Sequence, residues 1–316
     1  MDKVTFFNLG NADTTLIATE KGSNILIDYA HMRSSEQSTS TMCTLPEELN
    51  SRVAADTFDL VAFTHLDNDH VCGAEEYFHL DHAIRYQGGE RKKIKTLLVP
   101  ANVICENRND LQTSATLIQA EARYRLKQGT GIRIVSKPGR LREWMESRGI
   151  DYDSRKNLIT DAGQLVPEVS KIADGVELFI HSPFADTSKS IDRNGAALVL
   201  HATFNNTAST KMMLGSDIDH SIWCDIIEVT KYNDNDELRL TWDIFHLSHH
   251  CSYKSLSETK GTRETVPDEL IREMFEEYGN TSTLIISPSF AIDGDYERVQ
   301  PPHQQAFVAL PFFRQS

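Results

Sequence analysis

One short segment limits the architectures open to this chain, because a predicted buried strand runs directly into a loop of histidines and aspartates. The apolar residues 60–63 predict the strand. The loop that follows carries four side chains able to ligate a metal within six positions: His65, Asp67, Asp69 and His70. A strand that stops at such a loop directs several ligands to one point. Imidazoles and carboxylates gathered in this way hold one or two divalent cations in hydrolytic sites, so the segment predicts a metal centre at a strand end.

Two other interpretations of this loop are weaker. Asp69 could cap a helix that begins at His70, but a cap needs neither two histidines nor a second aspartate. A calcium loop of the EF-hand type is excluded, because Val71, Cys72 and Phe78 occupy positions that such a loop fills with a ligand, a glycine and a glutamate.

Composition narrows the classes of partner and location. The 316-residue chain has a formal net charge of −14, which argues against non-specific binding of nucleic acid over its whole surface. Basic clusters at 85–95 and 123–127 are most simply solvated faces, although they leave room for a local cationic strip.

No apolar run approaches the roughly 20 residues of a membrane span, and the N-terminus lacks a signal-peptide pattern. We therefore expect a cytoplasmic location and no membrane contact. Five scattered cysteines without a Cys-x-x-Cys pair disfavour a disulfide framework or a thiolate zinc cluster.

Strands are predicted in two groups. Apolar runs place them at 4–8, 15–18, 24–28, 59–64 and 96–99 in the first half, and at 176–180, 196–204, 211–214, 243–247 and 283–286 in the second. Residues 101–170 differ, since apolar residues recur at helical spacing from Leu111 to Leu126, and 267–278 predicts a further amphipathic helix. Two β-rich halves with helices outside favour two sheets packed face to face in a single domain over 1–316, with a helical insertion around 101–170.

Three later segments place polar side chains where a predicted strand begins or ends. Asp217 follows the strand at 211–214, His249 and His250 follow the strand at 243–247, and Asn194 precedes the strand at 196–204. Strand ends meet at one rim of a sandwich, so these residues could join the 65–70 loop. Taken alone, Asp217 could be an ordinary turn residue and the histidines ordinary surface or core residues.

In this order the elements resemble the metallo-β-lactamase-fold hydrolases, and most closely the branch found as the soluble domain of the DNA-uptake competence protein ComEC. The matching motifs are the Gly10–Asp13 turn, the strand at 24–28, the His65–His70 loop, the Asn194 segment, the Gly215-Ser216-Asp217 turn and the His249–Ser252 element. The likeness covers most of the chain outside 101–170. It implies an α/β fold, namely an αββα sandwich of two mixed β-sheets flanked by helices.

The resemblance also implies roles for these residues. His65 and Asp67 would ligate one metal ion, Asp69 and His70 would ligate the other, and Asp217 would bridge them. His249 or His250 would close the second site. His250 is favoured as the ligand, and its neighbour would contact substrate or orient the other ligands. An aspartate at 67, where the wider fold commonly has histidine, makes the site richer in oxygen and favours Mn²⁺ or mixed occupancy without excluding Zn²⁺.

The chain departs from the family pattern at a few positions. Asn194 stands where lactamase-type members have a further histidine ligand, so it is expected to contact substrate or to orient a ligand. Ser216 adds a residue to the usual Gly-Asp turn, and Cys251 replaces a glycine. The Pro-Pro-His sequence ending at His303 resembles the branch's C-terminal element and suggests a substrate contact there. His31, which follows the strand at 24–28, is a weaker candidate of the same kind.

The implied function is a dinuclear metal-dependent hydrolase with Zn²⁺ or Mn²⁺, in which a hydroxide shared by the ions attacks a phosphodiester. Asp69, Asn194 and His249 would be the catalytic residues, and nucleic acid or a nucleotide the expected substrate. Two alternatives stay open. The same fold could hydrolyse another ester, a thioester, a lactam or a phosphocholine-type substrate. The chain could instead be a regulatory scaffold with a degenerate metal site, in which 101–170 serves a protein partner. The sequence does not indicate the oligomeric state.

Overall fold

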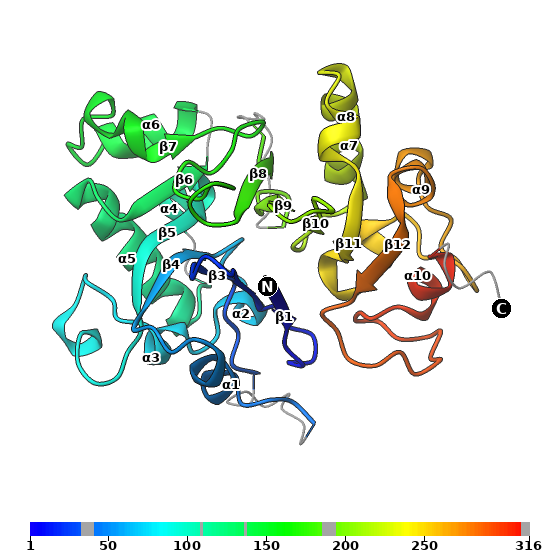
Figure 1. Ribbon diagram of the computed structural model, residues 1–316, viewed down its shortest axis with the longest axis horizontal. Helices are drawn as coiled ribbons and strands as arrows, with labels where there is room; N and C mark the ends of the chain where they lie inside the picture. Colours follow the sequence, from blue (N-terminus) through cyan, green and yellow to red (C-terminus); the bar gives the residue numbers. More distant parts are fainter. Residues whose placement is uncertain (33–40, 108–109, 136–137, 185–193, 311–316) are drawn as a thin grey trace.

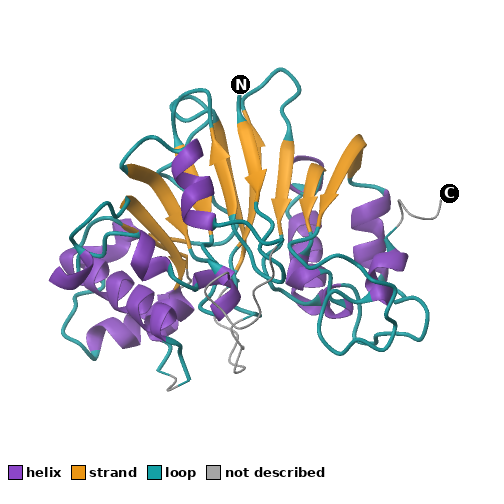
Figure 2. Ribbon diagram, turned by 90° about the horizontal axis from the view of Figure 1, so that it is seen from below, coloured by secondary structure: helices purple, strands orange, loops and turns teal. Residues whose placement is uncertain are grey.

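Two mixed β-sheets lie between two layers of helices in the computed structural model, which describes residues 1–32, 41–107, 110–135, 138–184 and 194–310 (Figures 1 and 2). The first sheet has seven strands in sequence order: β1 (Lys3–Phe6), β2 (Thr15–Ala18), β3 (Asn24–Ile27), β4 (Thr57–Ala62), β5 (Lys93–Pro100), β6 (Ile132–Val135) and β7 (Ile159–Thr160). The first three strands pair antiparallel, and β3 to β7 pair parallel.

The second sheet has five strands in the order β12-β11-β10-β9-β8: β8 (Val176–Ser182), β9 (Val199–Phe204), β10 (Lys211–Leu214), β11 (Trp242–His246) and β12 (Gly279–Ile286). β8, β9 and β10 pair antiparallel, whereas β10, β11 and β12 pair parallel. Both sheets are therefore mixed, and the predicted αββα fold class is confirmed.

Helices cover the outer faces. They are α1 (Leu45–Arg52), α2 (Asn68–Val71), α3 (Ala74–Tyr77), α4 (Ala101–Cys105), α5 (Thr113–Gln128) and α6 (Pro138–Glu146) in the first half, and α7 (His220–Tyr232), α8 (Asp236–Arg239), α9 (Glu269–Glu276) and α10 (Gln304–Ala309) in the second. Short 3₁₀ turns include η4 (Ser248–His250) and η5 (Tyr253–Ser255). Within the described ranges, no helix has both the length and the apolar content that a bilayer crossing demands.

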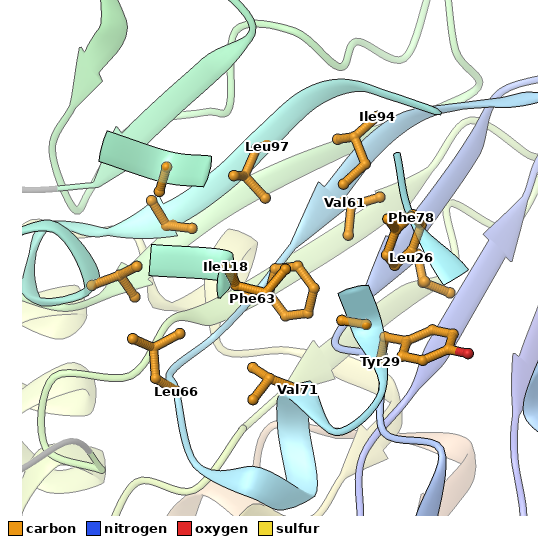
Figure 3. Packing of buried hydrophobic residues seen from close by; sticks show 14 of the residues in the cluster. Leu26, Tyr29, Val61, Phe63, Leu66, Val71, Phe78, Ile94, Leu97 and Ile118 are labelled. Carbon is orange, nitrogen blue, oxygen red and sulfur yellow. The ribbon is translucent and has the colours of Figure 1, made fainter. Parts of the chain in front are cut away.

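Three apolar clusters hold these layers together. The middle cluster joins the inner faces of the two sheets, with residues such as Leu60 and Leu98 from the first sheet and Leu178 and Met212 from the second. A second cluster lies between the first sheet and its helices, where Phe63 and Phe78 pack against Val71 of α2 and Ile118 of α5 (Figure 3). A third lies under α7, α9 and α10. Burial of this apolar surface is the main force that fixes the layers.

The segment at 101–170 contains the predicted helices and also two strands that the sequence did not reveal. The described parts of this segment fold as α4, α5 and α6, while β6 and β7 extend the first sheet. Arg133 interrupts the apolar residues of β6, and β7 has only two residues, so neither gives a clear apolar run in sequence. Because α5 contacts α2 and α3, this segment supports the elements that follow the His65–His70 loop.

Helix α7 was also absent from the sequence prediction, although the residues that cap it and those that pack it lie within its own segment of sequence. The Asp219 side chain caps it by accepting hydrogen bonds from the backbone N–H groups of Ser221 and Ile222. Trp223, Ile226 and Ile227 are buried at helical spacing against the second sheet.

Candidate metal centre

The loops that carry the candidate ligands all leave the same rim of the two sheets. The His65–His70 loop follows β4, Asp217 follows β10, and His250 lies in η4 after β11. Backbone hydrogen bonds tie these loops together: Leu198 donates to Thr64 O at 3.1 Å, and His249 donates to Ser216 O at 2.9 Å. The first sheet therefore supplies one group of side chains and the second sheet supplies the other.

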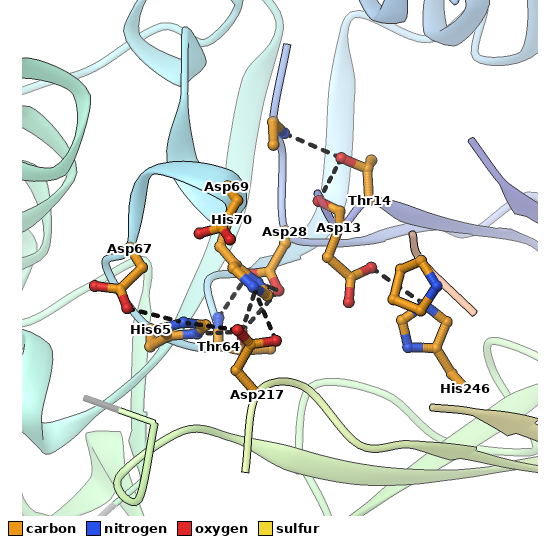
Figure 4. Close-up of polar contacts among 12 residues, drawn as sticks. Asp13, Thr14, Asp28, Thr64, His65, Asp67, Asp69, His70, Asp217 and His246 are labelled. Carbon is orange, nitrogen blue, oxygen red and sulfur yellow. Dashed lines mark hydrogen bonds and ion pairs between the residues drawn. The ribbon is translucent and has the colours of Figure 1, made fainter. Parts of the chain in front are cut away.

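Asp217 lies at the centre of this group (Figure 4). Its Oδ1 is 3.3 Å from Nε2 of His70, while its Oδ2 is 3.5 Å from Nε2 of His250 and 4.0 Å from Nε2 of His65. Nε2 of His250 is also 3.1 Å from Oδ2 of Asp69. One ligand atom from each of Asp69, His70, Asp217 and His250 lies within 4.8 Å of all the others. The two Asp217 oxygens thus face different histidines.

Several of these atoms are buried and have no hydrogen-bond partner within the described part of the chain. They are Nε2 of His65, Nε2 of His70 and Oδ1 of Asp217, and the three side chains are all less than 5% exposed. Unsatisfied polar atoms at this depth are costly unless something binds them. Imidazole nitrogens and carboxylate oxygens are the donor atoms that Zn²⁺ and Mn²⁺ accept. This donor set therefore fits divalent cations.

The remaining predicted residues occupy different places around this cluster. Asp67 lies beside it, with Oδ2 at 3.7 Å from Nε2 of His65. Asp67, Asn194 and His249 line an open cavity of about 1290 Å³, which also contains Asp69, Asp217 and His250 on its wall. The structure thus brings His250 into the four-residue cluster and places His249 at the cavity surface beside it.

His303 and His31 do not line this cavity. The ring of His303 is 2% exposed and contacts backbone on both sides, with Nε2 3.1 Å from Val299 O and Nδ1 3.4 Å from the Tyr253 backbone nitrogen. These contacts give His303 a place in the packing of the C-terminal loop. The His31 backbone N–H donates to Cys72 O at 2.9 Å, and its neighbour Met32 reaches the cavity wall instead.

Four residues behind the cluster were not among the predicted site residues. Oδ2 of Asp28 lies 2.7 Å from Nδ1 of His70, and Asp28 also accepts hydrogen bonds from the backbone N–H and the hydroxyl of Thr64, both at 2.7 Å. Oδ1 of Asp13 lies 3.3 Å from Nε2 of His246. A carboxylate on the far nitrogen of a ligand histidine fixes the orientation of its ring. The signal available in sequence was an aspartate directly after the apolar strand at 24–27.

The close packing of acids and bases shifts their pKa values strongly. Burial alone would raise the pKa of the Asp217 carboxyl, but His250 and His70 hold it well below its usual range. Burial opposes the charged form of His70, yet Asp217 and Asp28 raise the pKa of that ring well above the ordinary histidine value. For His250, burial is likewise outweighed by Asp217 and Asp69, which raise its pKa to about 9. These carboxylates attract positive charge strongly, whether protons or a metal ion supply it.

Metal binding should therefore release protons. At neutral pH the metal-free protein carries a proton on His250, and a cation that takes that nitrogen has to displace it. The apparent affinity for Mn²⁺ should rise roughly tenfold per pH unit for each displaced proton as the pH approaches about 9. Titration calorimetry in two buffers with different ionisation enthalpies measures this release. An affinity independent of pH between about 6 and 9 would contradict the assignment.

The turn that carries Asp217 depends on Gly215. A Cβ at this position would collide with Oγ of Ser248 and would lie 2.9 Å from Cζ2 of Trp223. We expect Gly215→Ala to lower the free energy of unfolding by about 1–3 kcal/mol and to weaken metal binding, because the turn has to shift. Gly88→Ala is the matched control, since a Cβ there meets nothing within 4 Å. Urea denaturation of both variants measures the difference, and equal stabilities would contradict this account.

Comparisons with known proteins give only weak likenesses. No protein-family model matches the chain, and no curated protein sequence does. Among solved structures, a Parabacteroides distasonis protein named as a metal-dependent hydrolase has a TM-score of 0.32 and 8% identity, over 92% of this chain and 94% of that one. A diphosphatase of the PhnP family has a TM-score of 0.31 and 11% identity, over 89% and 84%. Zinc-bound PqqB from Methylobacterium extorquens has a TM-score of 0.27 and 9% identity, over 75% and 59%.

Proposed function

We propose that this chain is a metal-dependent hydrolase that uses two divalent cations to cleave a phosphodiester. The observation that carries the proposal is the convergence of Asp69, His70, Asp217 and His250, whose ligand atoms lie within 4.8 Å of one another. Asp69, Asp217 and His250 also line a large open cavity. A buried structural ion would not require such a cavity beside it. Residues that gather at a cavity wall with strongly shifted pKa values are typical of active sites.

In this proposal the ligands divide between two ions. His65 and Asp67 would hold one ion, while Asp69, His70 and His250 would hold the other. Asp217 could serve both, because its Oδ1 faces His70 and its Oδ2 faces His250 and His65. When bound, a pair of divalent cations lowers the pKa of a water molecule and neutralises charge that develops on a transferring phosphoryl group.

The surrounding residues orient these ligands and contact the substrate. Asp28 and Thr64 hold the ring of His70 from behind, and the Pro288 carbonyl, 2.7 Å from Nδ1 of His250, holds that ring. Fixed rings keep Nε2 of each histidine directed at the metal without reorganisation. Asn194 and His249 line the cavity next to the cluster, where an amide and an imidazole can donate hydrogen bonds to a negatively charged oxygen.

The charge of the cavity wall favours a small substrate over a nucleic acid. Glu75 and Glu76 of α3 line the cavity, and Arg298 is the single arginine or lysine among the described residues of its wall. Nζ of Lys260 donates to the backbone carbonyls of Tyr296 and Arg298, which holds the Arg298 segment in place. A long polyanion requires a cationic track that neutralises many phosphates. One guanidinium suits a single phosphodiester group, such as that of a nucleotide.

A substrate panel tests this function. Protein loaded with Mn²⁺ or Zn²⁺ is assayed with bis(p-nitrophenyl) phosphate, a cyclic nucleotide, single- and double-stranded DNA, p-nitrophenyl acetate and a β-lactam, alongside metal analysis. We expect about two equivalents of metal and cleavage of the first two compounds, with DNA cleaved more slowly. Preferred cleavage of the acetate or the lactam would support the alternative ester or lactam hydrolase. Less than one equivalent of metal would favour the scaffold interpretation and overturn the proposal.

A further inference from the structure

A second, very small cavity lies between the two sheets behind the metal centre. Its volume of about 10 Å³ is close to the smallest that holds one water molecule. Six polar residues line it together with apolar side chains from both sheets: Asp13, Thr15, Asp28, Thr64, Ser216 and His246. A cavity of this size with a polar lining is suited to water, whereas purely apolar cavities stay dry.

Three polar atoms of these lining residues have no hydrogen-bond partner among the residues that the structure describes. They are Oγ1 of Thr15, Oγ of Ser216 and Nδ1 of His246, and the three side chains are 0%, 4% and 2% exposed. They come from separate elements, namely the start of β2, the turn after β10 and the end of β11. A buried polar group of this kind is costly if nothing binds it. Their convergence on one cavity points to a shared ligand.

We propose that one buried water molecule binds in this cavity and joins Thr15, Ser216 and His246, which makes Ser216 a positioning residue for Asp217. A water molecule offers two donors and two acceptors, and each hydroxyl can donate or accept. The carboxylate of Asp13, held 3.3 Å from Nε2 of His246, supplies a further acceptor on the same lining. A single water can therefore satisfy groups from both sheets.

A metal ion fits this cavity less well than water does. Asp13, Asp28 and His70 offer ligand atoms within 4.8 Å of one another behind the metal centre. However, Oδ2 of Asp28 and Nδ1 of His70 are already 2.7 Å apart, in direct contact, and leave no space for an ion between them. Asp13 is paired with His246 in the same way. Hydroxyls and an imidazole nitrogen that lack partners need hydrogen bonds rather than charge.

The water would fix the turn that presents Asp217. Ser216 has a positive φ of 48°, a left-handed conformation that is unfavourable for a residue with a side chain. Its backbone carbonyl accepts a hydrogen bond from His249 at 2.9 Å, and its hydroxyl lines the small cavity. With residue 216 held from two directions, the next residue presents its carboxylate to His65, His70 and His250. In this proposal Ser216, the extra residue of the Gly-Ser-Asp turn, holds Asp217 in position.

The water site is tested directly by a high-resolution crystal structure of the metal-free protein. We expect one density peak within hydrogen-bond distance of Oγ of Ser216 and Nδ1 of His246. Side chains that close the cavity, or a peak with the short distances and anomalous signal of a metal, would overturn the proposal. This part does not depend on the proposed function.

The positioning role rests on the proposed function and is tested by metal affinity rather than by hydrolysis. Ser216→Ala should weaken Mn²⁺ binding about 10–100-fold, the usual cost of losing a group that orients ligands. Ser216→Gly relieves the backbone strain but also lacks the hydroxyl, so it should lose affinity as well. Thr203→Val is the matched control. Oγ1 of Thr203 is also buried and has no hydrogen-bond partner among the described residues, but Thr203 pairs with Lys211, at the end of β9 away from the Asp217 turn.

Parent-like affinity in Ser216→Ala, or full affinity in Ser216→Gly, would show that the hydroxyl has no positioning role and would overturn that part of the inference. If the parent protein binds no Mn²⁺ or Zn²⁺, the proposed function fails, and the crystal structure alone decides the water site.

Discussion

Asp217→Asn should lower the kcat of the proposed phosphodiester hydrolysis by roughly a thousandfold, which corresponds to about 4 kcal/mol of lost transition-state stabilisation. The substitution keeps the size of the side chain but removes the charge that faces His65, His70 and His250 at 3.3–4.0 Å. An amide cannot serve two cations as a carboxylate can. We also expect the bound metal to fall below the parent value, because Asp217 is the proposed shared ligand.

Steady-state assays with bis(p-nitrophenyl) phosphate, combined with metal analysis, measure both effects. Asp225→Asn is the matched control, since Asp225 is an exposed residue of α7 outside the cavity lining. Circular dichroism of the metal-free variants shows whether the fold is retained. An Asp217→Asn protein with parent-like kcat would remove this residue from the site.

Acidification should destabilise the protein through two buried histidines that are not among the proposed metal ligands. His181 and His201 are 3% and 0% exposed, and each places Nε2 near a backbone carbonyl, that of Arg239 at 3.1 Å and that of Thr241 at 3.0 Å. Burial lowers the pKa of His181 to about 4. Burial, reinforced by the neighbouring His181, also lowers the pKa of His201 well below its ordinary value.

The sign of the effect follows from these depressed pKa values. Below about pH 6.5 the unfolded chain takes up protons on both histidines while the folded protein does not, so folding stability falls with pH. For His181 the loss is about 3 kcal/mol by the time the pH reaches its folded pKa, and above about pH 6.5 the effect is absent. The carboxyl groups of Asp69 and Asp217, whose pKa values are lowered, titrate at lower pH than these histidines and do not contribute in this pH range.

Urea denaturation of the metal-free protein at a series of pH values between 7.5 and 4.5 measures this slope. The double variant His181→Gln with His201→Gln keeps a side-chain donor for each carbonyl but cannot titrate, and its stability should vary less with pH. An unchanged slope in the double variant would show that other groups cause the acid sensitivity.

The layers of the fold could be predicted because each strand is marked by a run of apolar residues within its own short segment of sequence. The strands at 15–18 and 211–214 have the predicted bounds, since runs of apolar residues mark buried strands whatever they pair with. The same holds for the loop at 65–70, which the structure places at a strand end with Asp69 and His70 in a cluster with Asp217 and His250. The division of these residues between two metal ions stays a prediction.

The supporting contacts could not be predicted in the same way. Asp28 meets His70 across 42 positions of sequence, so its place after an apolar strand does not indicate which residue it contacts. His246 is separated from Asp13 by more than two thirds of the chain, and by sequence alone its neighbours His249 and His250 are better candidates for metal ligands. For His303, a motif suggested a substrate contact; its ring nitrogens lie near backbone atoms of Val299 and Tyr253, and the substrate contact stays a prediction.

The order of the strands along the chain has a consequence for synthesis. All seven strands of the first sheet lie within residues 3–160, so they leave the ribosome before Asp217 or His250 has been translated. At that stage the first half can bury its helical face, but its inner apolar face still awaits the second sheet. A nascent chain thus holds only His65, Asp67, Asp69 and His70 of the proposed ligands. The full set of proposed ligands is therefore expected to assemble only after the second sheet has been synthesised.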